Sequence, residues 1–253
     1  MSQPDRQPDP PGPLSPLAEQ LAEISALTGG LAHEIRNPLS TLKVNLQLLD
    51  EDWQRVENRE ASGGDDARDV ARRSRTRIAS LLKEANRLEQ ILQDFLVYVG
   101  KYELQREPHD LNRIVRELAD FYQPQAQAGG IELRLHLADQ PIVCDVDANR
   151  LKQAVLNLLI NAQQAMPDGG RIDLRVTDSA EGARIDVEDS GPGIPPQERD
   201  LVFRAYYSTK KGGTGLGLAT THRIIREHGG RIELDAPLPR GARFSIQLPK
   251  TRH

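Results

Sequence analysis

Two long runs of apolar residues at helical spacing constrain the fold of the N-terminal part of the chain. The first run extends from about Leu17 to Arg55, and the second ends at Val99. In both runs the apolar residues recur three and four positions apart, which places them on one face of a helix. They are Ile24, Leu27, Leu31, Ile35, Leu39, Leu42, Leu46 and Leu49 in the first run, and Leu81, Ala85, Leu88, Leu92, Phe95 and Val99 in the second. Because the polar segment 57–69 separates the runs, we expect two helices folded back as an antiparallel hairpin.

A hairpin of this kind carries more apolar surface than its own two helices can cover. Pairing of two hairpins into a four-helix bundle would bury both faces, so we expect a homodimer. The alternative is that the hairpin packs on the rest of its own chain. Residues 1–16 contain six prolines and almost no apolar side chains, and we expect a disordered tail there.

After Gly100 the pattern changes to an alternation of helices and strands. Helices are expected at 111–127, 149–166 and 215–228, and strands at 131–137, 142–146, 171–176, 184–187, 232–234 and 243–248. This mixture predicts an α/β sandwich in which one mixed sheet carries helices on one face. The expected fold class is therefore α+β, with a tail over 1–16, a helical hairpin over 17–104 and the sandwich over 105–253.

The composition excludes several classes of protein. Hydrophobic residues make up 38% of the chain and charged residues 28%, and the net charge of −4 argues against a nucleic-acid or anionic-membrane partner. No apolar run approaches the roughly 18–20 residues of a membrane span, and the N-terminus lacks the pattern of a secretory signal. The single Cys144 excludes an intrachain disulfide and a cysteine-rich zinc site. We therefore expect a cytoplasmic protein.

His33 lies within the first helical run but off its apolar stripe, so its imidazole is expected to face solvent. Arg36 and Asn37 follow three and four positions later and share its face of the helix. Pro38 has no N–H, so the carbonyl of Glu34 loses its helical partner, and we expect the helix to loosen one turn after the histidine. A lone histidine on a helix usually has no chemical role, so a function for His33 requires a phosphate source elsewhere in the chain.

Two asparagines stand in the middle of the apolar helix expected at 149–166. Asn157 and Asn161 lie four residues apart and share one helix face. Buried amides without partners are costly, so a polar group must meet them. Amide oxygens suit Mg²⁺, which takes few protein ligands when phosphates complete its shell. The alternative is that the two amides cap a neighbouring loop.

Two glycine-rich segments follow. Asp189 directly ends a strand, where its carboxylate can accept a hydrogen bond from an amino group such as that of adenine, and Gly191 and Gly193 come next. Glycines at 212–217 open the last helix, whose free N–H groups can bind phosphate. The basic and aromatic segment between them, 203–211, is typical of a mobile lid whose Lys210 approaches a polyphosphate. A tight turn at the first glycine segment and a solvated loop at the lysines are the alternatives.

In this order, the segments resemble those of the histidine protein kinases of two-component systems. Residues 33–39 match the phosphoacceptor box of this family, and 157–161 match its N box. Residues 189–193 and 213–217 match the two glycine boxes, and Phe203 matches the F box. It covers roughly Leu17 to Pro249. It implies a dimerisation and histidine-phosphotransfer hairpin, followed by an ATPase domain of the Bergerat type that binds ATP and Mg²⁺.

The resemblance implies catalytic roles on the hairpin. His33 would be phosphorylated, Glu34 would accept the other ring proton, and Asn37 would assist transfer or orient water when the enzyme runs as a phosphatase. Phosphoryl transfer needs positioning and charge neutralisation more than covalent help, which agrees with this division.

The resemblance also implies the nucleotide site. Asn161 would hold Mg²⁺ with Asn157 beside it, and Asp189 would recognise adenine. The other positions that would contact the nucleotide are Gly191, Gly193, Thr209, Lys210, Gly213, Thr214, Gly215, Leu216 and Gly217.

The implied partners are a second copy of the chain and the receiver domain of a response regulator, whose aspartate would accept the phosphoryl group. Only the 16-residue tail precedes the hairpin, so a separate sensory protein or a small signal is expected to supply the input. Two other hypotheses remain: another ATPase of the same nucleotide fold, and a non-catalytic adaptor that has kept the fold.

Overall fold

The computed structural model describes residues 16–59, 67–100, 103–179, 182–210, 213–235 and 241–250. The expected tail over 1–16 lies outside these residues except for Pro16, which begins the first helix. The central part of the polar connection (60–66), Lys211, Gly212 and the side chains of Ile24 and Leu27 also lie outside them. Contacts divide the chain into two compact units, 1–91 and 92–253. The expected boundary at residue 104, between the hairpin and the ATP-binding domain, stays a prediction.

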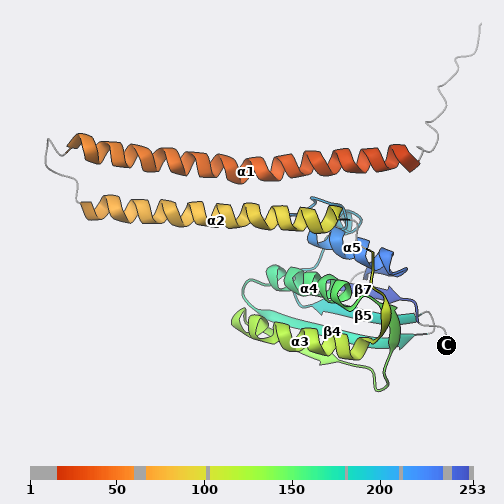
Figure 1. The fold of residues 1–253 in the computed structure, drawn as a ribbon. Helices are drawn as coiled ribbons and strands as arrows, with labels where there is room; N and C mark the ends of the chain where they lie inside the picture. Colours follow the sequence, from red (N-terminus) through yellow and green to blue (C-terminus); the bar gives the residue numbers. More distant parts are fainter. Residues whose placement is uncertain are drawn as a thin grey trace, which may run out of the picture. The chain divides into compact units, whose positions relative to one another are not determined.

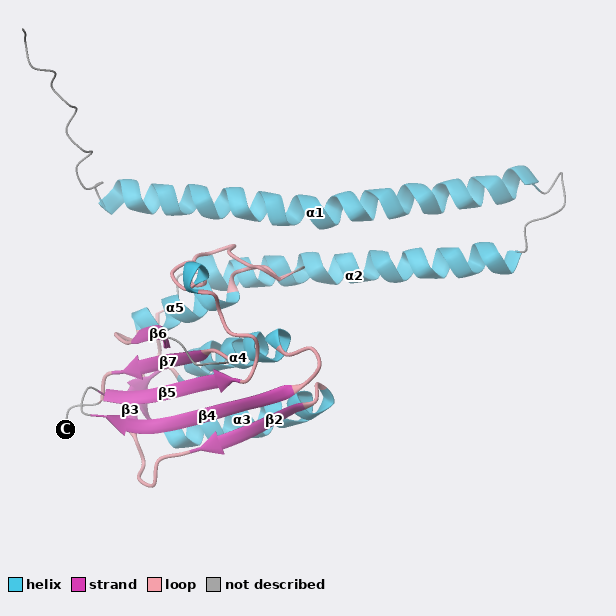
Figure 2. Cartoon of the chain, turned by 180° about the vertical axis from the view of Figure 1, so that it is seen from behind, coloured by secondary structure: helices cyan, strands magenta, loops and turns pink. Residues whose placement is uncertain are grey.

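Two long helices form the hairpin, as the sequence predicts. Helix α1 is Pro16–Arg59 and α2 is Ala67–Val99. They run antiparallel and side by side (Figures 1 and 2). Arginines of α2 reach across to α1: Arg77 binds the buried carboxylate of Asp52, and Arg87 binds Glu34. Polar pairs therefore help to fix the register of the two helices.

Both helices leave large apolar side chains exposed. Leu82 is 61% exposed, and Leu46 is 54% exposed. The other exposed side chains of this kind are Leu39, Val44, Leu48, Trp53, Ile78, Leu92, Leu96 and Val99. On α2, Ile91 is fully buried in the single chain, whereas Leu92 of the expected stripe is half exposed.

Helix α1 continues through Pro38 without a break. The hydroxyl groups of Ser40 and Thr41 donate to the carbonyl oxygens of Arg36 and Asn37, at 2.9 and 3.3 Å. These bonds give the carbonyls of the two residues before the proline additional partners, and such back-bonding is common where a helix bends. The proline therefore does not end the helix.

The second unit contains the predicted mixed sheet. Its strands are β2 (Ile131–His136), β4 (Gly170–Ser179), β5 (Gly182–Asp189), β6 (Arg231–Asp235) and β7 (Arg243–Leu248). Their order is β2-β4-β5-β7-β6, with β2 parallel to β4 and the other pairs antiparallel. One expectation was wrong: β3 (Val143–Val146) stays outside this sheet and pairs with β1 (Glu107–Asp110). Sequence reasoning missed β1 because Glu-Pro-His-Asp has no apolar alternation.

Three helices cover one face of this sheet (Figures 1 and 2). They are α3 (Leu111–Ala128), α4 (Ala148–Ala165) and α5 (Gly217–Glu227), and a short 3₁₀ helix spans Pro196–Glu198. Their apolar sides and the inward residues of the strands form one core. Asp110 and Asp147 cap α3 and α4, since their side chains accept hydrogen bonds from backbone N–H groups of the first turn. These caps fix the starts of α3 and α4, and α4 is the helix that carries Asn157 and Asn161.

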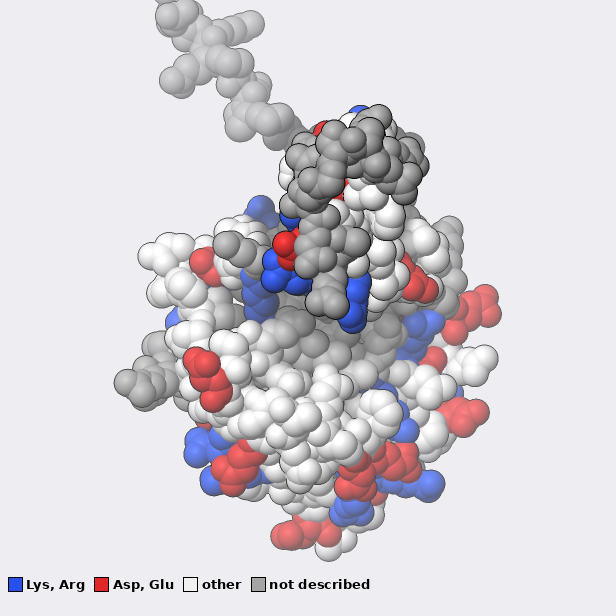
Figure 3. Space-filling view, turned by 90° about the vertical axis from the view of Figure 1, so that its left-hand side faces the viewer, with Lys and Arg blue, Asp and Glu red and all other residues white. Residues whose placement is uncertain are grey.

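Charged side chains of both signs lie on the surface of the molecule. On the face shown in Figure 3, lysine and arginine side chains are interspersed with aspartate and glutamate. Among the described residues, no helix combines the length and apolarity that crossing a bilayer requires.

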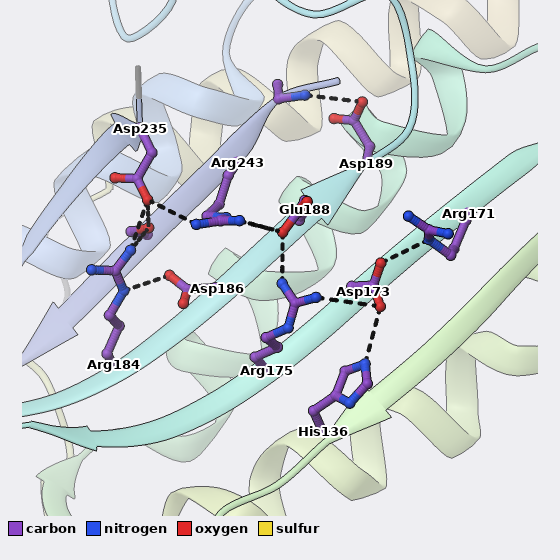
Figure 4. A network of polar contacts seen from close by, with 12 residues as sticks. His136, Arg171, Asp173, Arg175, Arg184, Asp186, Glu188, Asp189, Asp235 and Arg243 are labelled. Atoms are coloured by element: carbon purple, nitrogen blue, oxygen red, sulfur yellow. Dashed lines mark hydrogen bonds and ion pairs between the residues drawn. The ribbon is translucent and has the colours of Figure 1, made fainter. Parts of the chain in front are cut away.

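The other face of the sheet carries a ladder of ion pairs (Figure 4). Glu188 accepts hydrogen bonds from Arg175 at 2.6 Å and from Arg243 at 2.7 Å. Burial alone would raise the pKa of Glu188, but these two arginines outweigh it and lower the pKa. Because side chains alternate along β5, Glu188 faces the ladder and the next residue, Asp189, faces the helical side.

Candidate active site

Asn157 and Asn161 lie one turn apart on α4, as the sequence predicts. The amide nitrogen of Asn157 donates to the carbonyl oxygen of Gly217 at 3.2 Å and to the hydroxyl of Thr221 at 3.5 Å. Asn157 therefore ties α4 to the first turn of α5, and a contact of its side chain with a nucleotide stays a prediction.

Asn161 faces the loop that precedes α5. Its side-chain oxygen accepts a hydrogen bond from the ammonium of Lys210 at 2.5 Å, and its carbonyl oxygen accepts another at 3.1 Å. Gln164 Oε1 lies 3.3 Å from the same ammonium. Burial lowers the pKa of Lys210, although the nearby charge of Asp189 opposes this. An oxygen of α4 thus stands where it can meet a cation.

Asp189 ends β5 with its carboxyl group buried, at 7% exposure (Figure 4). Its Oδ1 accepts from the backbone N–H groups of Gly191 at 2.8 Å and Ala242 at 3.3 Å. Both of these hydrogen bonds involve Oδ1, and a contact of Asp189 with adenine stays a prediction. Burial raises the pKa of Asp189, and the two backbone bonds oppose the rise.

The first glycine segment is packed against the turn that leads into β7. Gly193 has a φ of +80°, and a Cβ atom there would lie 2.8 Å from the carbonyl oxygen of Gly241. A Cβ atom on Gly241 would lie 1.8 Å from the carbonyl oxygen of Asp189. Glycine is thus required at both positions because two backbones touch.

The glycines before α5 have different structural roles. Gly215 has a φ of +65°, and a Cβ atom there would lie 2.6 Å from the carbonyl carbon of Tyr206. Tyr206 itself, with a φ of +63°, is the one described non-glycine residue with positive φ. A Cβ atom on Gly217, by contrast, meets nothing within 4 Å. The space beside Gly217, at the start of α5, is therefore open.

The remaining predicted positions lie in the same loop. The hydroxyl oxygen of Thr214 accepts from the N–H of Leu216 at 3.4 Å, and the Leu216 side chain is fully buried. A Cβ atom on Gly213 would lie 2.6 Å from Ser208 Oγ, and Thr209 is exposed. Phe203 anchors the loop, with its ring 5.6 Å from that of His222 and 6.0 Å from that of Phe244.

The hairpin holds the second group of candidate residues. His33 and Asn37 are exposed on α1, which confirms the expected orientation of the histidine. Glu34 points toward α2, where its carboxylate oxygen accepts from the Arg87 guanidinium at 3.4 Å. Glu84 lies 4.0 Å from the same guanidinium.

The residues present suit a magnesium ion held mainly by a nucleotide. Asn161 Oδ1 already contacts a positive group, so it faces a place that accepts a cation. The described residues include no group of three or more His, Cys, Asp or Glu side chains suited to a metal. A single amide ligand is enough only when phosphate oxygens and water complete the octahedral shell.

Sequence reasoning missed several neighbours of the site. Gln164 was detectable, because it follows Asn161 by three residues and shares its helix face. Arg87 and Gly241 carry no local signal, because each meets its partner only through the tertiary fold.

The architecture and the site define a class of protein: an α/β nucleotide-binding domain joined to a helical hairpin that presents a histidine. Two family models match the chain. Residues 23–99 match the His Kinase A phosphoacceptor domain, and residues 146–252 match the histidine kinase-, DNA gyrase B- and HSP90-like ATPases.

Known proteins extend this likeness. The chain is 35% identical to the sensor histidine kinase ZraS of Escherichia coli O157:H7 over 231 residues, which are 91% of this chain and 47% of ZraS. It is 33% identical to the solved structure of the mycobacterial sensor histidine kinase MprB, with a TM-score of 0.52, covering 58% of this chain and 99% of that one. Histidine kinase ThkA, solved in complex with response regulator protein TrrA, gives a TM-score of 0.72 at 26% identity, covering 92% of this chain and 64% of that one.

The chain belongs to the sensor histidine kinases of two-component systems. It spans about half the length of the curated relatives that it matches.

Proposed function

We propose that the protein is an ATP-dependent protein-histidine kinase that phosphorylates His33 and passes the phosphoryl group to an aspartate of a response regulator. The observation that carries this proposal is the convergence of Asn161, Asp189 and the loop before α5 within one domain. Lys210 contacts Asn161 directly and its charge acts on Asp189. These three elements supply a metal ligand, an acceptor for an amino group and free helix N–H groups.

The reaction assigned to these residues is a phosphoryl transfer. A ring nitrogen of His33 attacks the γ-phosphorus of ATP, the bond to the β–γ bridging oxygen breaks, and ADP leaves. The loop and the N-terminus of α5 hold the phosphates, where the helix N–H groups favour negative charge. Magnesium, held by Asn161 and the phosphates, would neutralise charge on the polyphosphate.

Glu34 is the residue assigned to the second ring nitrogen of His33. Its present partner is Arg87, so an arginine of α2 sets the direction of its carboxylate. We infer that Glu34 divides its hydrogen-bonding capacity between the guanidinium and the imidazole, since a carboxylate has about four acceptor sites.

The proposal is tested by incubating the protein with γ-labelled ATP. Label that is lost in acid and kept in base identifies a phosphohistidine, and its transfer to a receiver domain identifies the partner class. ATP hydrolysis without protein-bound label would instead favour another ATPase of the same fold. A protein that neither hydrolyses ATP nor takes up label would be an adaptor.

Two glycines, Gly215 in the loop and Gly217 at the start of α5, distinguish a phosphate site from a purely structural turn. Gly217→Ala is expected to leave stability unchanged or to raise it by up to about 1 kcal/mol, because alanine is the better helix former and its methyl group has room. The same methyl group enters the proposed phosphate site, so ATP affinity should fall by about tenfold or more.

Gly215→Ala is the matched control, because its φ of +65° and its contact with Tyr206 make any side chain strained. This variant should lower the melting temperature as well as ATP affinity. Calorimetry with ATP and thermal unfolding separate the two effects. Unchanged ATP binding by Gly217→Ala would place the phosphates elsewhere.

We also propose that the chain is a homodimer through a four-helix bundle. The large apolar side chains that α1 and α2 leave exposed support this, because a second hairpin would remove them from water. The four-helix bundle would position His33 for the phosphoryl transfer.

Leu82→Asp tests the bundle, since Leu82 is 61% exposed in the single chain. Burying its unpaired carboxylate in an interface would cost several kcal/mol, so the variant should be monomeric and weakly autophosphorylated, with normal ATP affinity. Lys83→Asp, at the adjacent exposed position, should remain dimeric. Light scattering at micromolar concentration measures both, and a monomeric wild-type protein contradicts the bundle.

The proposal also includes a phosphoryl acceptor, a source of the input signal and a cellular compartment. A response-regulator receiver domain is the proposed phosphoryl acceptor and, in the reverse role, the substrate of a phosphatase activity. A sensory protein or small molecule supplies the input. The proposed compartment is the cytoplasm, which supplies ATP and keeps the buried thiol of Cys144 reduced.

A further inference from the structure

Lys210 contacts the oxygen that the proposed function assigns to magnesium. Its ammonium is bound by three oxygens of α4: the side chain and carbonyl of Asn161, and Gln164 Oε1. The Lys210 ammonium donates to Asn161 Oδ1, and a metal ion bound to the same oxygen would lie beside this positive charge, so the two cations compete for Asn161.

The backbone around Lys210 directs its side chain to α4. The N–H of Lys210 donates to Ser208 Oγ at 3.2 Å, and its carbonyl oxygen accepts from the N–H of Gly213 at 3.3 Å. Farther back, Phe203 fixes the start of the loop against His222 and Phe244. Lys210 therefore tethers the described segment 203–210 to α4.

We propose that Lys210 is an internal competitor for the metal site, which holds the loop on α4 until magnesium nucleotide displaces it. This inference rests on the proposed function, because it takes Asn161 as the metal ligand. The displaced ammonium stays next to the loop that holds the phosphates, where it meets negative charge. Lys210 then acts as a positioning residue, because it controls the availability of Asn161 and the position of the loop.

The first test uses the full chain without nucleotide. Hydrogen exchange of peptides covering 203–210 should be roughly three- to tenfold faster in Lys210→Met and in Asn161→Ala, because each removes a charge-assisted hydrogen bond. The double variant should exchange no faster than Lys210→Met, since Lys210→Met already removes the contact with the Asn161 side chain that Asn161→Ala removes. Arg204→Gln, which removes an exposed charge from the same loop, should exchange like wild type.

Equal exchange rates in wild type and Lys210→Met would refute the proposal that Lys210 holds the loop on α4. A lysine that contacts only bound phosphates also predicts equal rates, because it would have no partner in the nucleotide-free protein. The experiment therefore separates the two roles without reference to turnover.

The second test is a Mg²⁺ titration of ADP binding followed by calorimetry. Lys210→Met should need severalfold less Mg²⁺ for half-maximal enhancement of ADP affinity, while Arg204→Gln matches wild type. An unchanged or higher Mg²⁺ requirement in Lys210→Met would exclude competition. Wild-type protein that binds no ADP at any Mg²⁺ concentration would instead contradict the proposed function, and the exchange result would still stand.

Discussion

Replacement of His33 by alanine is expected to abolish autophosphorylation while ATP affinity stays within about twofold of wild type. The histidine is exposed on α1 in the first compact unit, whereas the proposed nucleotide site lies in the second. Loss of the attacking nitrogen leaves no acceptor for the phosphoryl group, so the decrease should reach the detection limit of the labelling assay. The exposed position predicts an unchanged melting temperature, since surface substitutions rarely alter stability by more than about 0.5 kcal/mol.

Asn37→Ala serves as the comparison for this variant. Asn37 lies one turn later on the same exposed face, so its removal should slow transfer without eliminating the label. Acid-labile label that persists in His33→Ala would move the acceptor to another residue and refute the assignment of His33.

Asn161→Ala is expected to reduce autophosphorylation by orders of magnitude through loss of the metal ligand. Without this oxygen the magnesium ion keeps only phosphate and water ligands, and charge on the transferring group is neutralised less well. Nucleotide affinity should become nearly independent of Mg²⁺, which a Mg²⁺ titration of ADP binding measures.

Two further variants serve as controls for the expected loss of Mg²⁺ dependence in Asn161→Ala. Gln164→Ala, one turn along α4, removes another partner of Lys210 but not the proposed ligand, so the Mg²⁺ dependence should remain. Asn161→Asp keeps an oxygen at the same place and should retain part of the metal response. A full Mg²⁺ response in Asn161→Ala would exclude the residue as a ligand.

The sequence by itself determined most of the helices and strands and the order of the site motifs along the chain. Spacing of three and four predicted both hairpin helices, and period-two alternation predicted a strand at 131–137, where the structure has β2. These signals are local: a helix or strand buries one face, and its apolar residues must repeat with the geometry of that element. The motif residues were detectable for a similar reason, since Asn157 and Asn161 break an apolar pattern and glycines mark close backbone approaches.

Only the tertiary structure decided which partners these residues meet. The short β1 has no pattern of its own and forms because β3 lies beside it. Asn157 ties α4 to α5, and Asn161 binds Lys210, although both amides look alike in the sequence. Glu34 meets Arg87 from a position 53 residues away. Each of these contacts joins segments distant in the chain, and their geometry depends on how the packed core brings the segments together.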